Sequence, residues 1–201
     1  MKLPIKQSLA LSASVIAVVG LVVAPMTASA VTDGPDGANV TLNIGPTLTM
    51  SVSNTATFSI TPDGTGVASS NNDTVTVSTN NSTGYKLQLK DLDATTTLGS
   101  SGITAHTGTA AVPTALTTVN TWGYRLDGGA GFGAGPTTAQ TNVPSLTSTL
   151  WAGITASWVD IKTTNTTASN EANQVFFAAL ANSTIPTGSY VEAIQYQSVT
   201  N

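Results

Sequence analysis

The sequence predicts an all-β protein: an antiparallel β-sandwich, immunoglobulin-like or jelly-roll-like, with about eight to ten short strands behind a cleaved signal peptide. Only 8% of the residues are charged, and the chain is rich in Thr and Val, which favour strands over helices. Short runs alternate apolar and polar residues, as half-buried antiparallel strands do. Gly, Pro, Asn and Asp bound these runs and predict the turns between them.

The first thirty residues have the order of an export signal. Lys2 and Lys6 precede an apolar run at 8–24, and the small residues Ala28 and Ala30 provide a peptidase site. We predict cleavage after Ala30, and hence an extracellular or cell-surface protein with no membrane span after cleavage. The alternative is an uncleaved anchor, although the run is slightly shorter than the roughly 20 residues that a span requires.

The charge balance limits the class of partner. Without Lys2 and Lys6, four basic residues face ten acidic ones, so the net charge after cleavage is −6. No basic patch is available for nucleic acid, and none is expected as a partner. Cysteine is absent, which excludes disulfides, thiolate catalysis and cysteine-ligated metals. No cofactor is predicted.

Residues 31–38 are predicted to be a flexible leader, and residues 39–201 a single domain. Long loops are expected at 91–121 and 127–149. Alternating runs predict strands at 39–45, 47–53, 55–61, 73–79, 84–90, 121–127, 145–154, 157–163 and 189–200.

Two runs near the C-terminus need separate comment. The run at 169–183 fits either a helical stripe or a strand, and the turn that follows it favours the strand. The closing run at 189–200 places Glu192 on the same face as Tyr190 and Tyr196. A charge among aromatic residues predicts a strand at the rim or edge of a sheet.

Four aromatic residues are the candidate ligand-binding residues: Trp122, Tyr124, Trp151 and Trp158. One interpretation makes the Trp residues anchors of the core. The other makes all four an exposed platform that stacks on sugars.

Four segments carry a resemblance to a known group of proteins. They are "TVTVSTNNSTGYKLQLKD", "TWGYRLDGGAGFG", "WAGI" and "IPTGSYVEAIQYQSVTN". They resemble small secreted β-sandwich proteins of bacteria and are similar to WxL-like cell-wall-binding domains, although Tyr196-Gln197-Ser198 stands where those domains have Trp-x-Leu. The closing hairpin also resembles subunits of fimbriae and spore-coat fibres, in which a neighbour's segment completes the sheet.

No catalytic residue is predicted. His106 lies in a polar loop without a neighbouring acid and is expected to be solvated. Asp91 and Asp93 are a candidate calcium pair, and the alternative is a solvated strand end. The Gly-rich stretch at 128–135 lacks the following helix that a phosphate site requires, so a loop tip with Phe132 tucked beneath it is expected.

A covalent cross-link from a Lys to an Asn is a further hypothesis, because a neighbouring acid can promote it in sandwiches without disulfides. Lys86, Lys90 and Lys162 lie in predicted strands. The alternative is that these Lys residues keep strand edges soluble.

The resulting expectation is an exported, non-enzymatic cell-surface protein. Its partners would be a cell-wall polymer or other surface proteins, including further copies of itself. The alternative is a lectin-like adhesin module that binds carbohydrate or protein through exposed aromatic residues.

Overall fold

A computed structural model describes residues 40–201 except 54, 94, 100–101, 134 and 136–137. Within these residues the chain is all-β, with eleven strands and no helix. A compact unit spans Gly45–Asn201. None of the described segments is a helix suited to crossing a membrane. The predicted export signal and the leader at 31–38 lie outside the described residues.

The strands form three sheets, in which every pairing is antiparallel except that of β4 with β6. The largest sheet has six strands, five of them in the order β1 (Leu48–Val52), β2 (Val67–Thr79), β10 (Ala168–Ala181), β6 (Thr121–Leu126) and β4 (Thr104–Ala105). The sixth strand, β7 (Gln140–Val143), lies outside this order and pairs with β2. The second has the order β11 (Ile194–Thr200), β3 (Tyr85–Asp91), β9 (Val159–Thr163). The third joins β5 (Thr114–Leu116) to β8 (Leu146–Trp151).

The first core contains side chains from the six-stranded and the three-stranded sheets. Val75 and Val77 of β2 alternate with less buried neighbours, as do Leu87 and Leu89 of β3, and all four are fully buried in one cluster. Phe177 of β10 joins them. The period-two pattern therefore directs one face of each strand into this core.

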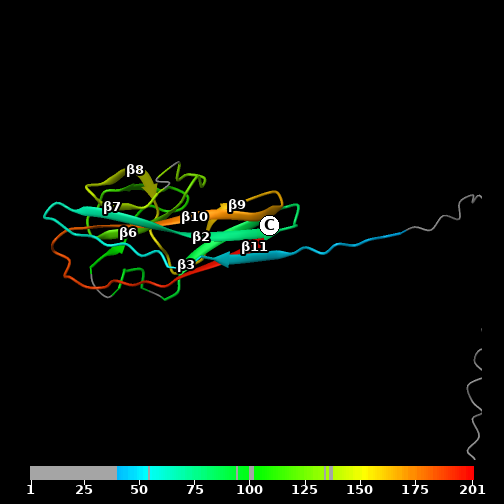
Figure 1. Ribbon diagram of the computed structural model, residues 1–201, viewed down its shortest axis with the longest axis horizontal. Helices are drawn as coiled ribbons and strands as arrows, with labels where there is room; N and C mark the ends of the chain where they lie inside the picture. Colours follow the sequence, from blue (N-terminus) through cyan, green and yellow to red (C-terminus); the bar gives the residue numbers. More distant parts are fainter. Residues whose placement is uncertain (1–39, 54, 94, 100–101, 134, 136–137) are drawn as a thin grey trace, which may run out of the picture. The chain divides into compact units, whose positions relative to one another are not determined.

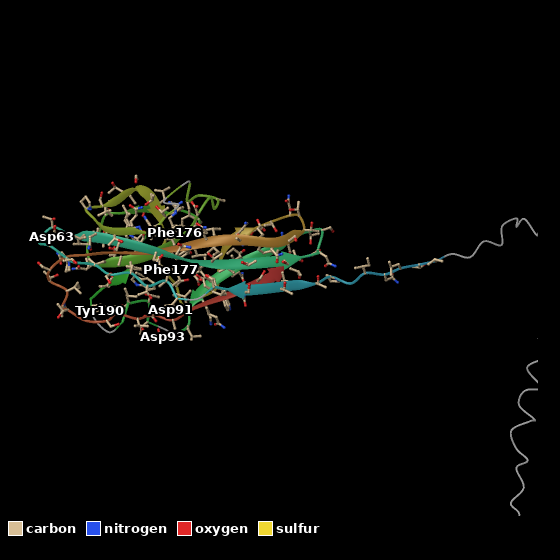
Figure 2. The ribbon with its side chains drawn as sticks, viewed as in Figure 1. Asp63, Asp91, Asp93, Phe176, Phe177 and Tyr190 are labelled. Atoms are coloured by element: carbon tan, nitrogen blue, oxygen red, sulfur yellow. The ribbon has the colours of Figure 1, made fainter. Side chains whose placement is uncertain are left out.

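A second core covers the opposite face of β10. Phe176, next to Phe177, packs in a separate cluster with Leu116 of β5 and with Leu146 and Trp151 of β8. Figure 1 shows β2 and β10 side by side, with β8 on one side of them and β3 on the other. The two labelled Phe residues lie on this central strand (Figure 2).

The two cores explain the ambiguous run at 169–183. Residues 175–181 of β10 are all buried, so apolar residues are continuous instead of alternating. Strands that are buried on both faces have such runs. The prediction of a strand is confirmed, and the helical alternative is wrong.

Two predicted strands do not form. The chain at 40–47 has no strand, and Val40, Leu42 and Ile44 are 94%, 79% and 77% exposed. Residues 55–61 also lie outside any strand, although Phe58 and Ile60 pack partly against the first core. A strand also needs a neighbouring strand with which its backbone forms hydrogen bonds, and an alternating sequence does not guarantee one.

Other elements were longer or shorter than expected. β2 begins at Val67, several residues before the predicted strand, and the predicted loops at 91–121 and 127–149 contain β4, β5 and β7. The closing strand β11 begins only at Ile194, and it lies at an edge of its sheet, as predicted. Phe132 is 2% exposed, which confirms that it is tucked beneath the Gly-rich loop.

Candidate functional site

The four candidate aromatic residues do not form an exposed platform. Trp122, Tyr124 and Trp151 are 3%, 1% and 0% exposed. Trp158 is partly exposed, and the ammonium of Lys90 lies 5.0 Å from the centre of its ring. The platform hypothesis is therefore wrong for three of its four members.

The buried aromatic residues are anchors because their polar atoms find partners inside the protein. The indole nitrogen of Trp122 donates to the backbone oxygen of Thr96 at 3.0 Å, and that of Trp151 donates to the hydroxyl of Thr149 at 2.8 Å. A buried Trp is stable only where its N–H is satisfied in this way. The core interpretation is confirmed for both Trp residues.

His106 was expected to be solvated, and this expectation is wrong. The side chain is 6% exposed, and its Nε2 lies 2.9 Å from the hydroxyl of Thr114. Burial lowers the pKa of His106, so the ring is neutral at pH 7. Its backbone explains the burial, because the amide of His106 donates to Trp122 of β6 and so holds this segment against the sheet.

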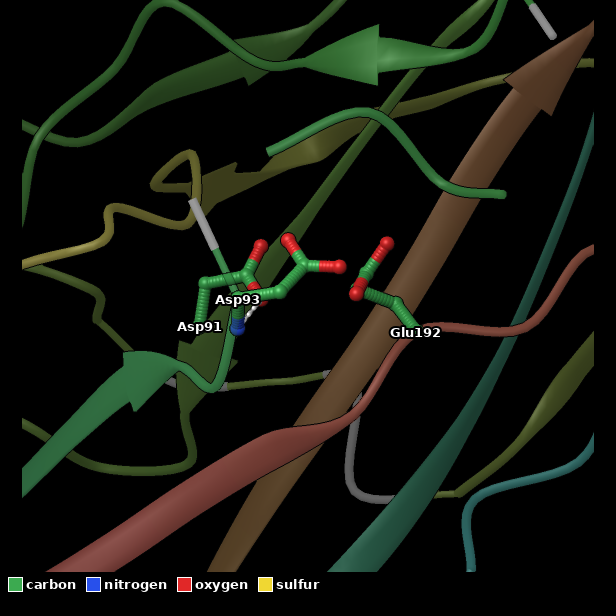
Figure 3. A group of neighbouring side chains, drawn as sticks. All are labelled: Asp91, Asp93 and Glu192. Carbon is green, nitrogen blue, oxygen red and sulfur yellow. Dashed lines mark hydrogen bonds between the residues drawn. The ribbon is translucent and has the colours of Figure 1, made fainter. Parts of the chain in front are cut away.

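The two acids of the candidate calcium pair are joined by a third. Asp91 ends β3, Asp93 follows it, and Glu192 precedes β11, which pairs with β3. One carboxylate oxygen from each lies within 4.8 Å of the other two. Figure 3 shows the three carboxylates converging. Carboxylate oxygens are suitable ligands for Ca²⁺.

The electrostatics of this acidic cluster are unfavourable without a cation. Asp91 is 1% exposed, and burial raises the pKa of its carboxyl, with the charge of Asp93 adding to the shift. Burial, then repulsion from Asp91 and Asp93, raises the pKa of Glu192. Asp93 differs, since hydrogen bonds from Thr95 lower its pKa and keep it ionised.

We expect Glu192→Gln to raise the melting temperature at pH 7 in a chelator. Folding raises the pKa of this carboxyl, so its ionisation lowers the free energy of unfolding once the pH is above the raised pKa. That loss is absent when the pH is below the pKa of the carboxyl in the unfolded chain. The gain should be roughly 1–3 °C, as for a partly exposed charge, and it should disappear near pH 3 (about a unit below the usual Glu pKa). Thermal unfolding with and without Ca²⁺ is the measurement.

Calcium provides the control for that experiment. If the three carboxylates hold Ca²⁺, the ion stabilises the unsubstituted chain, and Glu192→Gln then lowers the melting temperature in calcium. Gln195→Glu, on the exposed side of β11, is a matched change of charge that should leave the calcium response intact. If Glu192→Gln were less stable than the unsubstituted chain in chelator, the claim that Glu192 is repelled by Asp91 and Asp93 would be wrong.

A second polar cluster connects the two large sheets. The ammonium of Lys162 (β9) lies 2.6 Å from Glu171 Oε1 and 2.6 Å from Asn173 Oδ1, both on β10. The hydroxyl of Tyr85 (β3) donates to Glu171 Oε2 at 2.7 Å, and the Asn173 amide donates to that hydroxyl at 3.2 Å. These four residues are called the Lys–Asn cluster below.

Burial distinguishes this cluster from an ordinary surface ion pair. Tyr85 and Asn173 are 0% and 3% exposed, whereas the side chains of Lys162 and Glu171 are 26% and 35% exposed. Burial disfavours ionisation of Glu171, but hydrogen bonds from Lys162 and Tyr85 outweigh it and hold its pKa below the usual value. Burial and the bond to Glu171 raise the pKa of Tyr85, which stays protonated.

The other two candidate Lys residues are placed differently. Lys86 pairs with Asp160 at 3.0 Å, with both side chains more than a third exposed. Lys90 lies over Trp158. Among the residues that the structure describes, neither contacts an Asn side chain, so of the three only Lys162 does.

Sequence reasoning did not identify Glu192, Glu171, Asn173 or Tyr85 as members of these clusters. Glu192 is about a hundred positions from Asp91, and only the pairing of β11 with β3 brings them together. Glu171 and Asn173 did carry a signal, because positions i and i+2 of a strand share a face. That signal required 169–183 to be assigned as a strand first.

The fold and the two clusters define an all-β protein whose polar side chains gather where separate strands meet. Beyond that class, no protein-family model, curated protein or solved structure matches the chain.

Proposed function

We propose that this chain is an exported, non-enzymatic β-sandwich protein of a bacterial cell surface, which assembles with further copies or with other surface subunits. The observation that carries the proposal is the exposed segment Val40–Ile44. Its apolar residues Val40, Leu42 and Ile44 alternate with polar ones and are each more than three quarters exposed.

An exposed alternating segment is suited to strand addition. An extended segment can pair with a sheet edge of another subunit through its backbone, and alternate side chains then enter pockets. In the described part of the chain, the three-stranded sheet has β9 and β11 at its edges. Those edges are candidate acceptors on a neighbouring copy.

Two further features support a structural role at the surface. The six-stranded and three-stranded sheets contribute to one core, as the two layers of an immunoglobulin-like or jelly-roll-like sandwich do. The N-terminal sequence has the order of an export signal. The resemblance to WxL-like and fimbrial proteins supports the wall polymer or another surface subunit as partner.

The test is the oligomeric state of the full chain by size exclusion with light scattering over a wide concentration range. We expect oligomers that dissociate in Val40→Thr/Leu42→Thr/Ile44→Thr. Burying one such side chain contributes about 1.5–3 kcal/mol, so three substitutions should weaken association by at least about 100-fold.

Thr41→Ser/Asn43→Ser is the matched control, because it changes the alternate polar positions and should leave assembly intact. Binding of the chain to isolated cell walls is measured in parallel. A full chain that is monomeric at every concentration and has no affinity for walls would refute the proposal.

A further inference from the structure

The Lys–Asn cluster has the geometry of a bond-forming site. Lys162 lies opposite Leu87 in the β3–β9 pairing, and Leu87 faces the first core. Glu171 and Asn173 lie opposite Val77 and Val75, which face the same core from the other sheet. The amine of one sheet therefore points at the amide of the other.

The distance between the reacting groups is short. Nζ of Lys162 is 2.6 Å from Oδ1 of Asn173. Because a C=O bond is about 1.2 Å long, Nζ lies within about 3.8 Å of the Asn173 carbonyl carbon. Reacting atoms in near-attack arrangements are about 3–3.5 Å apart, so a small movement of a flexible Lys side chain is sufficient.

The amide is also held in place. Asn173 Nδ2 donates to the backbone oxygen of Val75 and to the hydroxyl of Tyr85, both at 3.2 Å. Tyr85 in turn donates to Glu171, which fixes the carboxylate beside Nζ. An amine, a buried amide and a proton-accepting carboxylate are thus positioned together before any reaction.

We propose that Lys162 and Asn173 form an intramolecular amide bond, promoted by Glu171, which joins β9 of the three-stranded sheet to β10 of the six-stranded sheet. This inference is independent of assembly and would hold for a monomer.

The reaction balances without any added reagent. Glu171 accepts a proton from the Lys162 ammonium, and the free amine attacks Cγ of Asn173. The protonated carboxyl stabilises charge on Oδ1 and then returns its proton to the leaving nitrogen. The new Nζ–Cγ bond replaces the Cγ–Nδ2 bond, and Nδ2 leaves as ammonia, which takes up the proton that the amine nitrogen loses. An ammonium and a primary amide become a secondary amide and an ammonium ion.

The test is mass spectrometry of the purified, denatured full chain. We expect a mass one ammonia lower than that of the unmodified chain. Cleavage after acidic residues cuts the backbone between Lys162 and Asn173, at Glu171, so the bond should appear as a branched peptide containing both. The unmodified mass, or an ammonia loss confined to linear peptides, would overturn the proposal.

Variants separate the chemistry from folding. Lys162→Arg keeps a cation beside Glu171 but lacks the nucleophilic amine, so the chain should fold and keep its full mass. Glu171→Gln should slow bond formation by about 10²–10⁴-fold, as expected for loss of a general acid–base. Lys86→Arg changes another Lys in the same sheet and should still lose ammonia. Circular dichroism confirms folding, and a branched peptide in Lys162→Arg would equally contradict the assignment.

Discussion

Phe176→Ala and Phe177→Ala should both destabilise the protein strongly, although the two residues are neighbours on one strand. Each Phe is buried, Phe176 in the second core and Phe177 in the first. Replacement of a buried Phe by Ala costs about 3–5 kcal/mol, because apolar contact is lost and a cavity remains. For a domain of this size that corresponds to a fall in melting temperature of roughly 6–20 °C.

The control is Gln174→Ala on the same strand, where β10 still has an exposed face. It should change the free energy of unfolding by no more than about 0.5 kcal/mol. Chemical denaturation of the three variants gives the comparison. If Phe176→Ala behaved like the Gln174 control, β10 would have only one covered face, and the small β5–β8 sheet would not pack where the structure has it.

Gly153→Ala should be the most damaging of the small substitutions. The segments around His106, Gly123 and Gly153 approach closely, with the amide of Gly153 donating to Gly108 at 2.8 Å. A Cβ at Gly153 would overlap the backbone oxygen of His106. Backbone cannot rotate away as a side chain can, so we expect a cost of about 3 kcal/mol or more, at the upper end of overpacking effects.

Gly45→Ala is the matched control, because a Cβ there has no atom within 4 Å. It should be neutral, or stabilising by about 0.4–1 kcal/mol through the unfolded chain. Melting temperatures of the two variants decide the point. Equal stabilities for Gly153→Ala and Gly45→Ala would show that the crossing of the three segments is looser than the structure has it.

The local pattern of the sequence was sufficient for strands that bury one face. β1 and β3 were found where an apolar residue alternates with a polar one, because a strand with one covered face imposes that period. The same pattern misled at Val40–Ile44 and at 55–61, where no strand forms. Alternation records which side chains prefer burial and does not record whether a neighbouring strand is present.

The candidate sites were less predictable than the strands. Asp91 and Asp93 are near each other in sequence and were identified, but Glu192 reaches them only through the pairing of β11 with β3. Lys162, like Lys86 and Lys90, lies in a run that predicts a strand, and nothing local in the sequence distinguishes it from Lys86. Its contacts with Glu171 and Asn173 arise because β9 and β10 belong to different sheets that face one core.

By itself, the sequence determined that the chain is all-β and low in charge, since composition and the period of two act on each strand separately. Only the tertiary structure decided which strand faces are covered by another layer of the protein and which face solvent. Arg125 illustrates this, because it lies between Tyr124 and Leu126 of the first core and yet is 0% exposed. Its guanidinium lies 6.0 Å from the centre of the Trp151 ring and donates to the backbone oxygen of Gly133 at 2.7 Å. A third layer of chain covers that face, and burial by a distant segment is a property of the packed fold.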